Sequence, residues 1–402
     1  MALDHIFASR AARMKASEIR ELLKLLDRPG ILSFAGGIPD PNLFPAQEFA
    51  AACSTALDPA HAGQALQYSV SEGYMPLRRW IVAHMAQLGI EVSVDNVLIT
   101  SGSQQALDYL GKLFLSPGDT ALVGWPTYLG ALAAFNAYEP RYDRLTINDN
   151  RAPGDIAQAA EAGGGRVKLA YLSPDFANPT GETIDRPGRE RLLDLAETLD
   201  CAVIEDAAYQ ALRYDGDDIP PILALELARK GTIDACRTVY CGSFSKTLSP
   251  GLRVGWAVAA RPVISQMVLL KQAADLHSAT MNQMAVAEVA DRCFDSHVTT
   301  LRDTYRARRD AMLTALAAHM PDGVTWTKPE GGMFVWLTLP IGTDAAALLQ
   351  RSLDTVQVAF VPGQAFFADG SGANTLRLSF SCADEATIAE GMRRLGQLLR
   401  DA

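Results

Sequence analysis

The 402-residue chain lacks an excess of basic residues and has no low-complexity segment. Its 46 acidic residues outnumber its 36 lysines and arginines, which gives a formal net charge of −10. Because proteins that bind the nucleic-acid backbone usually present a basic face, this balance argues against nucleic acid as a partner. Hydrophobic residues make up 49% of the chain. That content is sufficient for one large or two ordinary domains, each with a sizeable core.

Cysteine and histidine are also sparse, with six of each. The cysteines form no C-x-x-C pair, and scattered thiols are typical of a reducing compartment rather than of disulfides or a metal cluster. The N-terminus carries charges at Asp4, Arg10 and Arg13, with no apolar run long enough for a signal peptide. We therefore expect a cytoplasmic protein without a metal site.

Long charge-free apolar runs are rare, and one of them imitates a membrane span. The segment TALVGWPTYLGALAAFNAY, residues 120–138, has roughly the length that crosses a bilayer. However, Pro126, Thr127 and Asn136 interrupt it. The segment is better interpreted as a short buried strand, a turn and a helix, so we expect no membrane association.

Through the middle of the chain, short apolar runs alternate with helical patterns. Strands are predicted at residues 96–100, 120–124, 167–173, 201–206 and 237–243, and GWAVA, residues 255–259, could add another. Helical patterns at residues 104–115 and 189–200 separate some of these runs. This alternation predicts an α/β fold with a mostly parallel central sheet covered on both faces.

After about residue 285 the pattern changes. An amphipathic helix is predicted at residues 302–320, strands at 331–339 and 374–381, and a closing helix at 383–402. We therefore expect a large domain at residues 46–285 and a smaller α+β domain at 286–402. The N-terminal segment 1–45 would supply an arm and part of the small domain.

Two motifs place polar residues where strands and helices meet. TSGSQQAL, residues 100–107, could form an anion site from backbone N–H groups, a helix dipole and the side chains of Ser103 and Gln104. The alternative is ordinary helix capping, which uses the same residue types. SPDFANPTGETI, residues 173–184, follows an apolar strand. Its Asn178 belongs either to a simple turn or to a ligand site at the sheet edge.

Two further motifs add charged side chains. AVIEDAAYQAL, residues 202–212, puts Asp206 and Tyr209 at the end of a strand, where they could cap a helix and fill the core or could contact a ligand. In YCGSFSKTLSPGLRVGW, residues 240–256, Lys246 is either a solvated lysine at a strand edge or one that forms a Schiff base beside a bound phosphate.

In this order and at these separations, the four motifs resemble those of the fold-type I pyridoxal-phosphate aminotransferases of class I/II. SFAGGIPDPNLFP, residues 33–45, and YSVSEGYMPLR, residues 68–78, resemble the branch that includes α-aminoadipate and kynurenine aminotransferases. The similarity runs from about residue 10 to the C-terminus. It implies the fold-type I architecture, pyridoxal 5′-phosphate as cofactor, and a homodimer with shared active sites.

The resemblance also implies roles for individual residues. Lys246 would hold the cofactor as a Schiff base and move the Cα proton, and Asp206 would pair with the pyridine nitrogen. Asn178 and Tyr209 would bond the phenolic oxygen, and Tyr128 would stack on the ring. The residues implied at the phosphate are Ser103, Gln104, Ser243, Ser245, Arg253 and, from the neighbouring subunit, Tyr68.

On the substrate side, Arg377 matches the family arginine that binds the α-carboxylate. The alternative interpretation is a surface arginine in a salt bridge. Gly37 would lie close to the substrate, and Asn178 would also contact it. Arg20 would lie on a helix at residues 17–26 and contact the distal end of the substrate. The simpler interpretation is that Arg20 belongs to a solvated helix face.

The implied reaction is transamination of aromatic, aliphatic or 2-aminoadipate-like amino acids, with a 2-oxo acid such as 2-oxoglutarate as acceptor. Another fold-type I enzyme, a β-lyase or a decarboxylase, would use the same lysine and aspartate. A non-enzymatic effector domain of a transcription regulator is disfavoured. Fewer than about 35 residues precede SFAGG, whereas a DNA-binding domain needs roughly 50.

Overall fold

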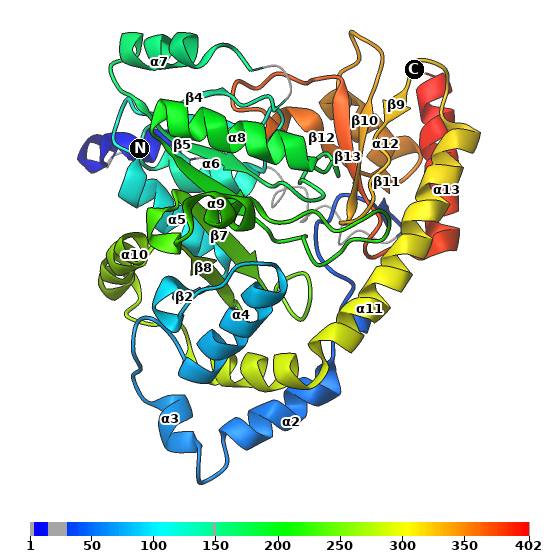
Figure 1. Ribbon diagram of the computed structural model, residues 1–402. Coiled ribbons are helices and arrows are strands. Elements are labelled where there is room, and N and C mark those ends of the chain that lie inside the picture. The colour runs from blue at the N-terminus through cyan, green and yellow to red at the C-terminus, as the bar shows by residue number, and fades with distance from the viewer. Residues whose placement is uncertain (1–3, 15–29, 148–149, 402) are drawn as a thin grey trace.

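A seven-stranded sheet forms the centre of the molecule (Figure 1). The computed structural model describes residues 4–14, 30–147 and 150–401. In the order β2-β8-β7-β6-β5-β3-β4, the sheet comprises β2 (Val97–Thr100), β8 (Gly255–Val258), β7 (Thr238–Ser243), β6 (Ala202–Asp206), β5 (Val167–Leu172), β3 (Thr120–Val123) and β4 (Arg141–Arg144).

The predicted mostly parallel sheet is confirmed. Strands β4, β3, β5, β6 and β7 are paired in parallel, while β8 runs antiparallel to both of its neighbours. The run GWAVA is thus a strand, but one of reversed direction. Strands β2 and β3 are buried at every position, which explains why they lack the alternation of a half-exposed strand.

Helices cover both faces of this sheet. One face packs against α5 (Ser103–Phe114), α6 (Leu129–Asn136) and α10 (Arg261–Ala274). The other packs against α4 (Met75–Gln87), α7 (Pro153–Ala162), α8 (Arg186–Leu199) and α9 (Ile222–Lys230). The apolar segment at 120–138 forms β3, a turn and α6, as predicted. Within the described ranges, no helix is both long and apolar enough to cross a bilayer.

A second unit is built on a four-stranded antiparallel sheet of order β12-β13-β10-β9. Its strands are β12 (Val361–Pro362), β13 (Thr375–Ser379), β10 (Phe334–Thr338) and β9 (Thr325–Trp326), and its helices are α12 (Ala345–Thr355) and α13 (Glu385–Arg400). The short β1 (Leu32–Ser33) pairs with β11 (Val358–Ala359), so part of the N-terminal segment packs in this unit.

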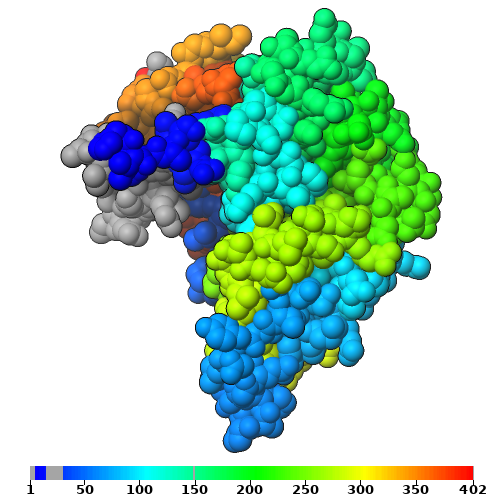
Figure 2. All heavy atoms as spheres, turned by 90° about the vertical axis from the view of Figure 1, so that its left-hand side faces the viewer, coloured from blue at the N-terminus to red at the C-terminus, as the bar shows by residue number. Residues whose placement is uncertain are grey.

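The 40-residue helix α11 (Thr280–His319) connects the two units. It leaves the central sheet and runs beside α13, as the yellow and red helices of Figure 1 show. The predicted boundary at residue 285 falls inside α11, and the domain limits therefore stay a prediction. Helices α2 (Ala46–Ala56) and α3 (Ala62–Leu66) protrude at the bottom of Figure 2.

Short 3-10 helices complete the architecture: Asp4–Ile6, Ser9–Arg13, Pro41–Leu43, Val94–Asn96, Ile233–Ala235 and Gly363–Phe366. Capping residues fix several helix starts. For α8, the Asp185 side chain accepts a hydrogen bond from the N–H of Gly188.

Because β3, β5, β6 and β7 are parallel, the loops that follow them meet at one edge of the sheet.

Candidate active site

A cavity of about 310 Å³ lies at this edge of the central sheet. Fourteen site residues are predicted from the sequence, and twelve of them line the cavity. The twelve are Gly37, Ser103, Gln104, Tyr128, Asn178, Asp206, Tyr209, Ser243, Ser245, Lys246, Arg253 and Arg377. The four sequence motifs, up to 150 positions apart (Ser103 to Arg253), are thus brought together in one place.

Lys246 follows strand β7 and points its amine into the cavity. The Nζ atom donates a hydrogen bond to the backbone oxygen of Gly37 at 2.8 Å and lies 5.9 Å from the centre of the Tyr209 ring. Burial lowers the pKa of Lys246 to about 8, and the positive charges of Arg377 and Arg253 act in the same direction. About a tenth of this amine is therefore neutral, and nucleophilic, at pH 7, far more than for an unperturbed lysine.

Asp206, the last residue of β6, is buried with only one carboxylate oxygen bonded. Its Oδ2 accepts a hydrogen bond from the Tyr171 hydroxyl at 2.7 Å, whereas Oδ1 has no partner in the described part of the chain. Burial raises the pKa of Asp206 to about 6, although the Tyr171 hydroxyl, the Ala208 backbone N–H and the charge of Lys246 favour its ionised form. A buried, unpartnered carboxylate oxygen is costly unless a ligand provides its donor.

Tyr171 was not predicted from the sequence. It sits in the buried strand β5, which reads as an ordinary apolar run. The available signal was weak: a buried tyrosine hydroxyl usually needs a partner, but the sequence does not say which one. The pairing of β5 with β6 brings it to Asp206.

Three aromatic or amide side chains line the middle of the cavity. The Nδ2 of Asn178 lies 3.5 Å from the hydroxyl of Tyr209, at the limit of a hydrogen bond. Burial raises the pKa of Tyr209 well above its usual range and that of Tyr128 to about 12. Both phenols are thus neutral at ordinary pH and able to donate hydrogen bonds.

One end of the cavity gathers donors suited to an anion. Ser103 is the first residue of α5, and the first turn of a helix leaves backbone N–H groups without internal partners. The guanidinium of Arg253 lies beside this turn, where it donates to the backbone oxygens of Pro250 and Ser101. The side chain of Gln104 instead donates to the Gly130 oxygen at 2.7 Å, which leaves its backbone N–H for a ligand.

Arg377, on strand β13, also lines the cavity. Its Nη1 donates to the Oδ1 of Asn178 at 2.7 Å and its Nη2 to the Ala35 oxygen at 3.0 Å. Only 2% of Arg377 is exposed, and no carboxylate of the described residues lies within ion-pair distance of it. Burial lowers its pKa to about 10. A buried arginine without an acidic partner is ready to receive an anionic ligand.

Gly37 lies beside this arginine. A Cβ atom added at Gly37 would lie 3.1 Å from Cζ of Phe334 and 3.5 Å from Nη2 of Arg377. A side chain would therefore occupy space next to the guanidinium.

Two of the predicted residues are not among these twelve. Tyr68 is 80% exposed, does not line the cavity, and packs edge to face on His277 with ring centres 6.1 Å apart. Arg20 lies outside the residues that the structure describes. Cavity residues that the sequence did not indicate are Ile38, Leu129, Tyr171, Ser173, Ala208 and Pro250.

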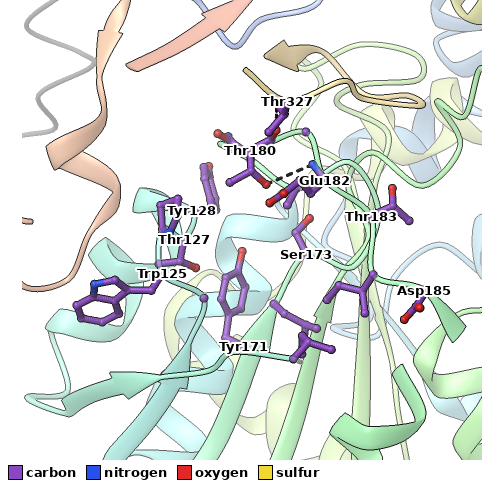
Figure 3. A pocket seen from close by; sticks show the side chains of 18 of the residues that line it. Trp125, Thr127, Tyr128, Tyr171, Ser173, Thr180, Glu182, Thr183, Asp185 and Thr327 are labelled. Atoms are coloured by element: carbon purple, nitrogen blue, oxygen red, sulfur yellow. Dashed lines mark hydrogen bonds between the residues drawn. The ribbon is translucent and has the colours of Figure 1, made fainter. Parts of the chain in front are cut away.

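A larger cavity of about 650 Å³ adjoins the first and shares part of its wall (Figure 3). Tyr128, Tyr171 and Ser173 line both, while Thr180 and Glu182 lie on the loop above in this view. Lys328, which lines the larger cavity, is exposed. The convergent buried charges lie in the smaller cavity, which is therefore the better candidate for chemistry.

Comparison with known proteins shows which family has this sequence. The model of the family "Aminotransferase class I and II" matches residues 40–395. The 2-aminoadipate transaminase of Thermus thermophilus is 46% identical, over 98% of this chain and 96% of its own length. The aromatic-amino-acid aminotransferase 1 of Thermococcus litoralis is 42% identical, over 99% of this chain and 95% of its own.

Among solved structures, the α-aminoadipate aminotransferase of Thermus thermophilus, crystallised with N-(5′-phosphopyridoxyl)-L-leucine, has a TM-score of 0.88. It is 42% identical, and the match covers 100% of this chain and 99% of that one. The predicted fold-type I architecture is thereby confirmed. The lysine, aspartate and arginine in one cavity and the match over residues 40–395 lead to one conclusion: this chain belongs to the class I and II aminotransferases.

Proposed function

We propose that this chain transfers the amino group of bulky or acidic L-amino acids to a 2-oxo acid, with 2-oxoglutarate as the main acceptor. The donors would be aromatic, aliphatic and 2-aminoadipate-like amino acids. Transamination with pyridoxal 5′-phosphate is the chemistry of the family. One observation carries the assignment to this cavity: a half-buried lysine amine and a buried arginine without an acidic partner face the same space.

The residues present fit the cofactor. The unpartnered Oδ1 of Asp206 is a suitable acceptor for a protonated ring nitrogen. The anion-suited end, with Ser103, Ser243, Ser245 and Arg253, would hold the phosphate together with the first turn of α5. Asn178 and Tyr209 would hold the phenolic oxygen, and Tyr128 would lie against the ring.

When bound, the cofactor supplies an aldehyde that captures amines and a ring that withdraws electrons from the substrate Cα. The Lys246 amine would hold that aldehyde before the substrate arrives, and would afterwards take the proton from Cα at its Nζ atom and deliver it again. A pKa of about 8 suits both steps, because the amine is near balance between its two protonation states.

Arg377 would bind the substrate carboxylate through its planar guanidinium. In the present geometry its Nη1 bonds Asn178, and its Nε has no partner among the described residues. An incoming carboxylate would therefore find a donor available at once. The same arginine serves donor and acceptor, since both carry an α-carboxylate.

Capture of the cofactor should depend on pH. Below about pH 8 the ammonium form of Lys246 predominates, and only the neutral amine attacks an aldehyde. We expect the rate constant for pyridoxal phosphate uptake by the cofactor-free protein to rise with pH through about 8 and then level off. The control is 4′-deoxypyridoxine phosphate, which has no aldehyde, and whose binding should not show this rise. Uptake that is equally fast on both sides of pH 8 would contradict the assigned pKa.

Substrate choice is the least constrained part of the proposal. The exposed Ile38 and the partly buried Leu129 add apolar surface to the cavity lining, which suits aliphatic and aromatic side chains. Arg20, which lies outside the described residues, would pair with the distal carboxylate of dicarboxylic substrates. The test is a donor panel with 2-oxoglutarate, in which glutamate formation is measured. A panel in which only pyruvate or glyoxylate accepts the amino group would overturn the proposed acceptor.

Two other fold-type I reactions use the same lysine and aspartate, namely β-elimination and decarboxylation. Both produce something that transamination does not, either ammonia with an unsaturated fragment or carbon dioxide. We favour transamination because the relatives with high coverage of this chain are named as aminotransferases. A cytoplasmic location stays a prediction.

We also propose a homodimer in which Tyr68 reaches the phosphate of the neighbouring subunit. The 80% exposure of this tyrosine beside the exposed Leu66 and Val70 supports a covered position in a larger assembly. Within its own chain Tyr68 lines no part of the smaller cavity.

Mixing subunits of two impaired variants tests this sharing. Tyr68→Phe should weaken cofactor retention, and Lys246→Ala should remove the reactive amine. In a mixed dimer, both lesions would fall in one site, and the other site would combine an intact lysine with an intact tyrosine. We therefore expect activity at limiting cofactor to recover on mixing. If subunits exchange, as mass spectrometry can show, and activity does not recover, the sites are not shared.

A further inference from the structure

An ion pair between a buried lysine and a partly exposed aspartate lies beside the start of helix α5, which forms part of the anion-suited end of the cavity. Lys271, near the end of α10, is 0% exposed, and its Nζ lies 3.0 Å from both carboxylate oxygens of Asp275. Neither residue lines the smaller cavity. A fully buried ammonium group carries a large desolvation cost, and apolar residues of similar size would often be as stable or more so. The pair therefore calls for an explanation beyond stability.

The other bonds of Lys271 all lead toward the start of helix α5. Its Nζ donates to the side-chain oxygen of Gln105 at 2.8 Å and to the hydroxyl of Ser278 at 3.0 Å. Asp275 in turn accepts from the amide of Gln105 at 2.7 Å and from the hydroxyl of Ser101 at 3.1 Å. The ion pair is thus satisfied by side chains that surround one short turn.

Ser101 is the residue on which these bonds converge. Its N–H donates to the Gln105 side chain at 2.8 Å, and its hydroxyl lies 3.0 Å from that of Ser278. Its backbone oxygen faces the cavity side, where it accepts from Nη2 of Arg253 at 3.5 Å. Ser101 therefore joins the Lys271–Asp275 ion pair to the arginine assigned to the phosphate.

The next residue, Gly102, turns the chain into α5. It has a φ of +84°, a conformation that favours glycine, and an added Cβ would collide with the guanidinium of Arg253. The direction in which the first N–H groups of α5 point thus depends on how the Ser101–Gly102 turn is held. Displacing Ser101 would displace both kinds of phosphate donor, the helix N-terminus and Arg253.

We propose that Lys271 and Asp275 are positioning residues for the cofactor phosphate, which act by fixing the Ser101–Gly102 turn without touching the ligand. The ion pair also keeps this region nearly neutral, since an unpaired Asp275 would place a negative charge behind the phosphate. The inference rests on the proposed function, because it assumes that the phosphate lies at this end.

Comparing pyridoxal phosphate with pyridoxal isolates this role. Both aldehydes are captured by the same lysine, but only the former has a phosphate. In the full-length cofactor-free protein, Lys271→Met should weaken the equilibrium binding of pyridoxal phosphate roughly tenfold or more, the usual cost of lost bonds to a charged group. Binding of pyridoxal should change by less than about twofold. Ser101→Ala, which keeps the backbone and the ion pair, should show a smaller loss with the same selectivity.

Lys230→Met is the matched control, because Lys230 also forms an ion pair, with Glu197 at 2.6 Å, but on α9 away from the cavity. It should leave both affinities unchanged. Equal weakening of both aldehydes in Lys271→Met and Ser101→Ala, or no change in either variant, would overturn the inference. If Lys271→Met fails to fold, the selectivity of Ser101→Ala decides. A wild-type protein that does not prefer pyridoxal phosphate to pyridoxal would instead contradict the proposed function.

Discussion

Replacing Lys246 with alanine is expected to abolish transamination. This side chain is the lysine that lines the smaller cavity, and it would serve both as the amine that holds the cofactor and as the base at the substrate Cα. Losing both roles should lower kcat by about 10³-fold or more. Borohydride reduction followed by intact-mass measurement should add one cofactor to each wild-type subunit and none to the variant.

Lys328→Ala provides the control, since Lys328 is an exposed lysine at the neighbouring larger cavity. It should keep both activity and covalent labelling. Added small primary amines should partly restore the Lys246→Ala variant, because they can supply the missing base. Substantial turnover in Lys246→Ala without any added amine would mean that another group carries the chemistry.

Asp206→Asn is expected to retain the cofactor but lose about 100-fold in kcat, the usual scale for removing one group that stabilises charge in the transition state. The amide cannot keep the ring nitrogen protonated as a carboxylate does. The unpartnered Oδ1 of Asp206 is the acceptor that we propose for that nitrogen. Steady-state kinetics and cofactor content measured on the same preparation separate the two effects.

Tyr171→Phe is the matched variant on the other side of the carboxylate. It removes the 2.7 Å bond to Oδ2 but leaves the negative charge in place. We expect a much smaller loss of activity, since the ion pair with the ring is preserved. A kcat for Asp206→Asn within a few-fold of the wild type, or an equal loss in Tyr171→Phe, would contradict the role given to Asp206.

The alternation of apolar runs was sufficient to predict the parallel sheet, because strands covered on both faces contain few polar residues. The reversed direction of β8 was not predictable, because the hydrophobic pattern of a short apolar strand such as GWAVA does not depend on the direction in which the strand runs. Of the long α11, only the C-terminal half was predicted, as the helix at residues 302–320, because the pattern changes from a helix packed on the large sheet to one packed beside α13.

The cavity residues were predictable where short motifs carry them, as for Lys246 and Asn178. Tyr171 and Lys271 were missed for a physical reason. Each satisfies its polar group through a residue on another element, Asp206 for Tyr171 and Gln105 for Lys271. A sequence shows that a buried polar group needs a partner, but only the folded chain shows which residue it is.

Reaction of the cofactor-loaded protein with one amino acid in the absence of any 2-oxo acid tests the central claim most directly. The account predicts one equivalent of the corresponding 2-oxo acid per subunit, no ammonia, no carbon dioxide, and a cofactor that keeps the amino group until 2-oxoglutarate is added. Continuous release of ammonia or carbon dioxide, with no aminated cofactor left on the protein, would show that this cavity performs elimination or decarboxylation and would contradict the account.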